Sequence, residues 1–232
     1  MAIIEGGTTG SLVEAGNAAA LAQHVTCKPV PHGSLGHYRI AATSGTLAAA
    51  LAALGQLFYV RWTDATRFFV LHKFKASFQP LTLFTAATLT DFGFDLCKAT
   101  AVSAGAGGTD LGALVKTKMR ATMGASLLDT AGLMRISTTA ALTALTTLDA
   151  TCIAQSVGDS QVVNANTAAG TPIELPRVND PTVLYVADMA SGEHPLVLAQ
   201  NEGLVLRNRA VWPAAGTGIV QIEMVWSEVS AF

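Results

Sequence analysis

The segment between Cys27 and His37 is the one place in this sequence where side chains that could bind a metal ion cluster. It holds one cysteine and two histidines, His32 and His37, with Ser34 between the histidines. A structural zinc site takes about four ligands arranged as spaced pairs, so this set is incomplete. Ser34 also lacks the glycine two residues before it that a hydrolase nucleophile elbow requires. We therefore predict solvent-exposed loop histidines, with no metal ion and no cofactor.

Four glycines between residues 105 and 112 have the composition of a phosphate-binding loop but not its spacing. A dinucleotide fingerprint needs its third glycine where this chain has Asp110, and a P-loop needs a lysine where it has Ala113. The run is therefore predicted to be a flexible loop.

The carboxylates that could form a glycosidase-type catalytic pair are Asp64, Asp91 and Asp95. Most carboxylates of the chain lie beside turns, where an aspartate side chain accepts hydrogen bonds from the local backbone. We predict that turn role for them. The sequence contains no arrangement that indicates an enzyme or a site for a small-molecule substrate.

Charged residues make up 13% of the 232 residues and hydrophobic residues 50%, whereas an ordinary soluble domain has about 25% charged residues. Such a chain keeps its apolar surface from water in lipid, in a fibre or against neighbouring subunits. The densest basic stretch has three cations, Lys116, Lys118 and Arg120, too few for the basic stripe that displaces counterions from nucleic acid. A direct nucleic-acid site is therefore not expected.

Residues 40–60 are the candidate for a membrane span, because they carry no formal charge and about 20 residues can cross a bilayer. Alanine supplies much of this stretch, small polar residues interrupt it, and no excess of Lys or Arg flanks it. We predict no membrane span, but a short helix or compact turn over residues 47–54 that leads into a strand at Leu57.

The N-terminus has no basic region followed by an apolar core, so no signal peptide is expected. Residues 1–38 are predicted to form an extended, exposed arm, and residues 39–232 the main domain. The chain is expected to stay in the cytoplasm that made it or in a particle that assembles there.

Cys27, Cys97 and Cys152 are far apart in sequence and odd in number, unlike the dense, even set of a secreted disulfide scaffold. The interpretation that fits this pattern is three small buried hydrophobic side chains. A disulfide, an intersubunit bridge and a reactive thiol stay open as alternatives.

Two apolar stretches, residues 57–63 and 67–75, are separated by three residues and therefore predict a β-hairpin. Alternation in the second stretch places one set of side chains on one face of the strand: Phe68, Val70, His72 and Phe74. The other face carries Phe69, Leu71 and Lys73. Both faces are largely apolar, which is typical of a strand buried between two layers.

Further strands are predicted at residues 92–99, 132–138 and 203–212, and residues 111–128 are predicted to be helical or irregular. A turn over 213–218 leads into a returning strand, residues 219–229. The expected inward residues are Phe92, Phe94 and Leu96 in the first of these strands, and Val220, Ile222, Met224 and Trp226 in the last. Roughly seven to nine short strands with Gly, Pro and Thr turns predict a mainly β fold, an antiparallel β-sandwich or jelly-roll-like domain, with a short helical segment and the N-terminal arm.

His194, Asn201 and Glu202 are the candidate interface residues. They bracket an apolar run that ends in an Asn-Glu-Gly turn, where Asn201 and Glu202 could contact another subunit or a ligand. The alternative is a tight turn in which Gly203 supplies a positive φ and Asn201 bonds the backbone.

The run from residue 194 to 203, with the strand, turn and strand that follow it, resembles the C-terminus of a poorly characterised family of virion structural proteins of tailed bacteriophages. Residues 69–78 and 92–96 are similar to central strands of that family, and residues 135–142 add to the likeness. It covers roughly two thirds of the chain, and residues 1–35 contribute little. The resemblance implies no catalytic residues.

Together these observations predict a non-enzymatic structural protein of a tailed-phage virion, associated with the capsid, neck or tail. Its expected partners are other copies of itself and other virion proteins, because a charge-poor surface can be covered by neighbouring subunits and permanent interfaces are the more hydrophobic ones. The alternative is a module that binds a host-surface glycan or protein. Such a site needs surface aromatics, and the chain has three tryptophans, Trp62, Trp212 and Trp226, of which the last lies on the apolar side of its strand.

Overall fold

The computed structural model describes residues 2–6, 11–15, 36–85, 90–101, 103, 105–143, 147–156, 161–162, 182–188 and 193–230. The chain divides into two units, residues 1–31 and 32–232. In the first, β1 (Ala2–Gly6) and β2 (Ser11–Ala15) form a two-stranded antiparallel sheet. The second unit begins its strands with β3 at His37, so residues 37 and 38, which the sequence analysis assigned to the arm, belong to a sheet.

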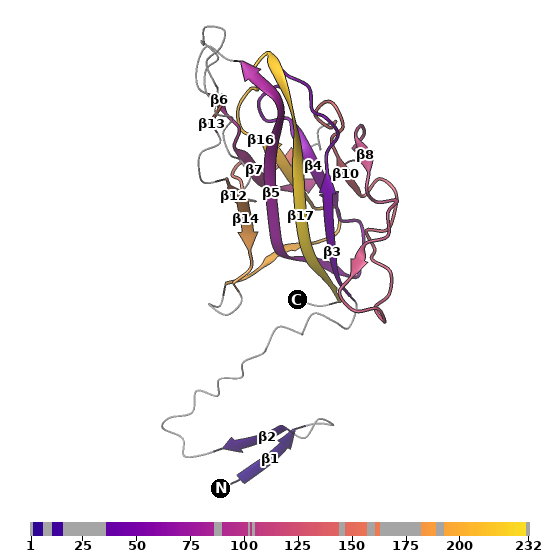
Figure 1. Cartoon of the computed structure of the whole chain (residues 1–232). Helices are drawn as coiled ribbons and strands as arrows, with labels where there is room; N and C mark the ends of the chain where they lie inside the picture. Colours follow the sequence, from indigo (N-terminus) through magenta and orange to yellow (C-terminus); the bar gives the residue numbers. More distant parts are fainter. Residues whose placement is uncertain are drawn as a thin grey trace. The chain divides into compact units, whose positions relative to one another are not determined.

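The larger unit is mainly β and contains two large antiparallel sheets (Figure 1). The six-stranded sheet has the order β14 (Thr182–Val186), β5 (Phe68–Thr85), β17 (Ala215–Val229), β3 (His37–Thr43) and β9 (Thr117–Lys118), and β15 (Leu196–Leu198) also pairs with β5. The seven-stranded sheet has the order β11 (Thr147–Leu148), β7 (Phe94–Ala101), β16 (Gly203–Asn208), β4 (Gln56–Arg61), β10 (Met134–Ile136) and β8 (Thr109–Asp110), and β12 (Ala154–Gln155) also pairs with β7. A separate pair consists of β6 (Thr90–Asp91) and β13 (Gln161–Val162).

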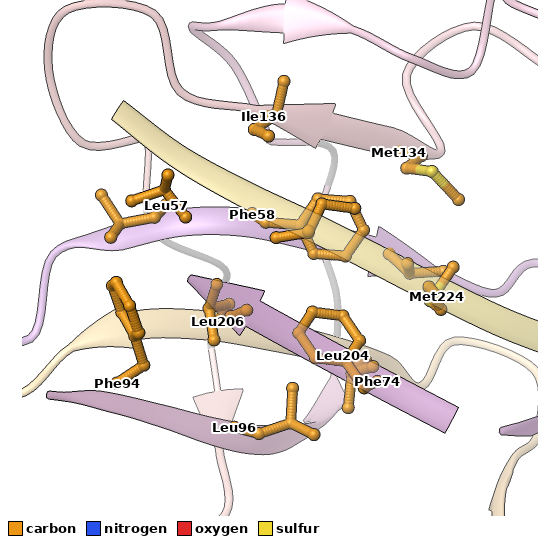
Figure 2. Close-up of a cluster of buried hydrophobic side chains, with 14 of the residues drawn as sticks. Leu57, Phe58, Phe74, Phe94, Leu96, Met134, Ile136, Leu204, Leu206 and Met224 are labelled. Carbon is orange, nitrogen blue, oxygen red and sulfur yellow. The ribbon is translucent and has the colours of Figure 1, made fainter. Parts of the chain in front are cut away.

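The inner faces of the two large sheets share one hydrophobic core. The rings of Phe58 on β4 and Phe74 on β5 lie 5.7 Å apart between centroids, although the two strands belong to different sheets. Figure 2 shows side chains from both sheets meeting there, with Leu204 from β16 and Met224 from β17. Because burying a large apolar side chain contributes about 1.5–3 kcal/mol, this shared core holds the sheets face to face.

The seven-stranded sheet is also covered on its outer face. Tyr59, Ala99 and Val205 on its central strands form a second, smaller cluster with Leu142, which bridges to Gln56 of β4, and Leu148 of β11. Strands covered on both sides need apolar residues at successive positions. The unbroken burial of β4 from residue 56 to 60 follows from this arrangement.

The predicted hairpin between residues 57–63 and 67–75 is wrong. β4 lies in the seven-stranded sheet between β16 and β10, and β5 lies in the six-stranded sheet, so the short connection passes from one sheet to the other. Asp64 shapes this connection by accepting hydrogen bonds from the backbone N–H groups of Thr66 at 2.8 Å and Arg67 at 2.7 Å. A connection of three residues is compatible with a hairpin and also with a crossing from one sheet to the other. Which of the two forms depends on the strands, far along the chain, with which β4 and β5 pair.

The returning strand predicted at residues 219–229 likewise joins the other sheet, because β16 and β17 are not paired. Its alternation is confirmed: Val220, Ile222, Met224 and Trp226 are all buried, as are Phe92, Phe94 and Leu96 around the start of β7. The strand predicted at 132–138 is present as the shorter β10.

The predicted alternation along β5 fails at His72, where the strand contains a β-bulge. Trp226 of β17 is opposite Leu71 while the preceding Val225 is opposite Lys73, so His72 is an extra residue on β5. One inserted residue exchanges the two faces of a strand. Leu71 and Phe74 therefore both point into the core, and the predicted common face of Phe68, Val70, His72 and Phe74 does not exist.

The short helical segment is absent from the described residues. Residues 47–54 adopt the alternative, a compact turn, in which Ala50 and Leu54 have left-handed φ values of 59° and 62° that an α-helix does not accept. Residues 111–128 are irregular apart from β9. Residues 40–60, which were considered as a membrane span and predicted not to be one, consist of the end of β3, this turn and most of β4. No helix in the described ranges is long and apolar enough to cross a membrane.

Deletion of His72 tests the bulge. We expect it to lower the free energy of unfolding by only about 1 kcal/mol, because Leu71 and Lys73 would then be adjacent, as their partners Trp226 and Val225 are, and the buried side chains of both halves of β5 would keep their face. His72→Ala keeps the extra residue and removes the 2.8 Å hydrogen bond between the ring and the Ser227 hydroxyl, so it should cost about 1 kcal/mol. Urea unfolding followed by tryptophan fluorescence measures both. A loss of more than about 4 kcal/mol on deletion would contradict the bulge, because deletion from a regular strand turns half of its buried side chains outward.

Candidate functional site

The predicted interface residues Asn201 and Glu202 form a tight turn that carries the chain from β15 to β16. Glu202 receives the backbone N–H of Ala199 on its carboxylate at 2.7 Å and pairs through its other oxygen with Lys98 at 2.7 Å. The backbone groups of the turn bond Trp62 at the end of β4, from Asn201 N–H to the Trp62 carbonyl and from Trp62 N–H to the Glu202 carbonyl, each at 2.8 Å. The turn is therefore firmly built into the seven-stranded sheet.

The left-handed residue of this turn is Asn201, with a φ of 65°, and not Gly203, which starts β16. Asparagine tolerates that conformation better than other residues with a side chain. The predicted positive φ was thus placed two residues too late.

His194 is exposed, and its Nδ1 donates to the carbonyl oxygen of Pro195 at 2.7 Å. It lines a shallow hollow of about 350 Å³ together with Lys98 and Tyr185. Since Lys98 also pairs with Glu202, the three predicted residues lie along one surface region. Their role as an interface stays a prediction.

Cys97 and Cys152 form a disulfide between β7 and the segment that precedes β12. The interpretation of these two as isolated buried thiols is therefore wrong, and the open alternative of a disulfide is correct. Sequence separation alone, 55 residues, gave no indication of which cysteines would meet. Cys27 lies outside the described residues, as do His32 and Ser34.

The carboxylates considered for catalysis are held by arginines or by turns. Asp95 is 2% exposed and accepts hydrogen bonds from Arg207 at 3.3 Å and Arg209 at 3.2 Å. Arg209 also pairs with Asp91 at 3.1 Å. Asp64 accepts three hydrogen bonds from Thr66 and Arg67, which lower its pKa, the backbone bond from Thr66 most of all. The predicted turn role is confirmed for Asp64 and for Asp91, which accepts the Gly93 N–H at 2.6 Å.

One backbone donor at the end of the glycine-rich loop, the Gly112 N–H, is engaged by a carboxylate. Asp110 accepts the N–H groups of Gly112 at 2.9 Å and Gly132 at 2.8 Å. In the described part of the chain no three His, Cys, Asp or Glu side chains group in a way that could hold a metal ion.

The segment 111–129, which we call the β9 loop, is held in place by a buried lysine. The Lys116 side chain is 0% exposed and its Nζ donates to the carbonyl oxygen of Leu111 at 2.6 Å and lies 3.4 Å from Asp129. Burial lowers the pKa of Lys116, and the Asp129 carboxylate opposes that shift. Asp129 also accepts the backbone N–H groups of Lys116 and Ser126. The ion pair thereby fixes two parts of the loop to each other.

A buried glutamate at the end of β17 fixes the same loop to the six-stranded sheet. Glu228 is 0% exposed and accepts hydrogen bonds from the Ser126 hydroxyl at 2.6 Å and the Leu127 N–H at 3.1 Å. Burial raises the pKa of Glu228, and these hydrogen bonds oppose the rise. Nearby, the Tyr38 hydroxyl donates to the Gly124 carbonyl at 3.2 Å, and burial, followed by the charge of Glu228, raises the Tyr38 pKa to about 12.

The β9 loop exposes apolar side chains while it buries charged ones. Leu114 is 53% exposed, Val115 79% and Met119 51%. Lys118 and Arg120 accompany them, and residues 113–125 contain no acidic residue. Lysine and glutamate are rarely fully buried, and large apolar residues usually are, so this loop reverses the ordinary arrangement. The sequence shows the basic stretch but not the partner of Lys116, which is why this surface escaped prediction.

Comparison of the chain with protein-family models, with curated proteins and with solved structures gave no match. The resemblance to tailed-phage virion proteins therefore stays a prediction from the sequence.

Glu228→Gln should change how stability depends on pH. A carboxyl group whose pKa is raised by folding contributes stability below its unfolded pKa and loses it as the pH rises through the folded pKa. The wild-type protein should therefore lose stability relative to Glu228→Gln as the pH rises from about 4. Urea unfolding between pH 4 and pH 8 measures this. The comparison variant Glu223→Gln removes from the same strand a carboxylate that pairs with Arg39 and is not buried. Parallel curves for wild type and Glu228→Gln would refute the effect.

Removal of the disulfide should destabilise the fold. Cys152→Ser is expected to lower the free energy of unfolding by about 2–4 kcal/mol, because the 55-residue loop is no longer closed in the unfolded chain. Reduction of the wild-type protein should produce a similar loss. Cys27→Ser serves as the matched control and should have little effect; if it costs as much as Cys152→Ser, the pairing is wrong.

Proposed function

We propose that this chain is a non-enzymatic structural protein of a tailed-phage virion, associated with the capsid, neck or tail. It assembles through contacts with other copies of itself and with other virion proteins. The observation that carries the proposal is the β9 loop, which is ordered by the buried Lys116 and Glu228 while it exposes Leu114, Val115 and Met119.

The energetics of this loop favour a binding role. Removing a charged group from water costs several kcal/mol unless hydrogen bonds and opposite charges compensate. The hydrogen bonds and the ion pair that compensate for the burial of Lys116 and Glu228 also hold the β9 loop in place, and the exposed side of this loop is apolar. A surface that is ordered before binding avoids the entropy loss of ordering on contact. A neighbouring subunit that covers Leu114, Val115 and Met119 would remove their apolar surface from water.

Two further features agree with a virion component. The chain contains 13% charged residues, which suits surfaces covered by neighbours. The Cys97–Cys152 disulfide is the kind of bond that persists on virion surfaces and other oxidising sites and is rare in cytosolic proteins. The resemblance to tailed-phage proteins points in the same direction.

We further propose that the two sheets of the larger unit form a β-sandwich of the jelly-roll-like kind and that the residues before β3 act as an arm that clasps neighbouring copies. The shared core of the two antiparallel sheets supports the first part. The two-stranded β1–β2 sheet supports the second, because a lone hairpin is at best marginally stable in water.

The alternative, a module that binds a host-surface glycan, gains no support from the aromatic side chains. Trp62, Trp212 and Trp226 are each at most 1% exposed, so none of them offers a stacking surface for a sugar ring.

Light scattering coupled to size exclusion, with cryo-electron microscopy of purified particles from a host that carries this gene, tests the proposal. At about 10 µM, where a micromolar contact is occupied, we expect the free protein to be oligomeric. We also expect the chain in repeated copies on the particle. A protein that is monomeric in solution and absent from the particles would refute the proposed function.

A further inference from the structure

We propose that copies of this chain associate edge to edge through their six-stranded sheets, with the β9 loop of one copy against the β14 edge of the next. This inference rests on the proposed function, since it identifies the contact through which the subunit assembles. The occupant of the exposed apolar surface is thus a second copy of the chain.

The β14 edge is the second exposed apolar surface of the same sheet. Val183 is 50% exposed and Val186 53%. Val183 is paired opposite Lys75 and Val186 opposite Lys73 of β5, which places both valines on the outer face of the sheet. Within the described residues β14 pairs with β5 alone and also contacts β12. It is therefore an edge strand of the described sheet, and edge strands can accept a neighbour.

The two surfaces lie at opposite edges of one sheet, since the strand order runs from β14 through β5, β17 and β3 to β9. Figure 1 shows β14 and β3 on opposite sides of β5 and β17. The registers also place them at the same level. One row of paired residues crosses all five strands: Val186, Lys73, Val225, Arg39 and Thr117. A neighbouring copy beside β14 therefore meets the next β9 loop without sliding along the strands.

The charges at the two edges are opposite. Lys118 and Arg120 accompany the apolar residues of the β9 loop, whereas the exposed Asp188 and Glu193 follow β14 in the chain. Lys73 and Lys75, which are paired opposite Val186 and Val183, lie one strand further in, on β5, and Lys98 lines a hollow with Tyr185 of β14. Complementary charges favour contact between unlike edges, and like charges disfavour a contact of either edge with itself.

Contact between unlike edges has a consequence for the assembly. Such a heterologous interface leaves one free surface of each kind at the ends of a dimer, so the same contact repeats until a ring closes or a filament grows. A symmetric dimer, by contrast, would use one edge of each copy and stop at two. The inferred assembly is therefore a ring or a filament of copies.

A mixing experiment with two surface variants tests this directly. Val115→Asp places a carboxylate in the β9 loop, facing the acidic edge, and Val186→Lys places a cation in the β14 edge, facing the basic loop. Each variant alone should weaken self-association at least about tenfold in sedimentation velocity. Their equimolar mixture should associate again in 1:1 complexes, because each variant keeps the surface that the other lacks.

Val211→Asp is the matched control, since Val211 is 59% exposed but lies between β16 and β17, outside both surfaces. It should leave self-association unchanged, and thermal unfolding should confirm that all three variants are folded. Variants that retain the wild-type oligomer would overturn the edge-to-edge contact but leave the proposed function standing. A monomeric wild type would also overturn the contact, and the proposed function would fail with it only if the chain is absent from the particles. Dissociation by one variant alone, or a mixture that stays monomeric, would overturn the pairing of unlike edges.

Discussion

The hydrogen bonds that satisfy the buried carboxylate of Glu228 determine the shape of the surface that we regard as functional. This carboxylate lies at the end of β17, one of the central strands of the six-stranded sheet, and accepts the Ser126 hydroxyl and the Leu127 N–H. A buried carboxylate needs such donors, so the β9 loop must reach the sheet at these residues. Once the loop is anchored there and around Lys116, the side chains of Leu114 and Val115 are directed to solvent.

The seven-stranded sheet also contains a buried charged group that is fully paired. Asp95 is buried with Arg207 and Arg209 beside the Cys97–Cys152 disulfide. Glu228 fixes the irregular β9 loop to a regular sheet, whereas Asp95 and Arg207 join the neighbouring strands β7 and β16 of one sheet. The low content of charged residues is therefore compatible with charges that each have a defined structural role. It leaves few of them to solvate the exterior, which is why apolar patches persist at the edges of the six-stranded sheet.

Local sequence patterns predicted what local interactions determine. The mainly β antiparallel character, the inward residues of β17 and the turn roles of Asp64 and Asp91 follow from alternation and from the hydrogen-bonding habits of aspartate, and these predictions were correct. The sheet to which each strand belongs depends on partners far along the chain. The predicted hairpin of β4 and β5 failed for that reason, as did the face assignment beyond His72, where one extra residue is visible only against β17. The β9 loop was not predicted as a candidate site for the same reason. From the sequence alone Lys116 is expected to be a surface cation, and only the structure shows that it is buried beside Asp129.

Both edges of the six-stranded sheet expose apolar side chains. An open edge with apolar residues invites uncontrolled pairing, and proteins usually block it with charge or cover it. Here the apolar residues of one edge are accompanied by Lys118 and Arg120, and the exposed Asp188 and Glu193 follow those of the other. In the proposed assembly, opposite charges favour binding of the unlike edge of another copy and like charges disfavour binding of the same edge. The exposed edges therefore bind selectively. The buried charges that anchor the β9 loop leave its apolar side chains uncovered in one copy. In the proposed assembly, the charges beside these side chains determine which surface of the next copy covers them.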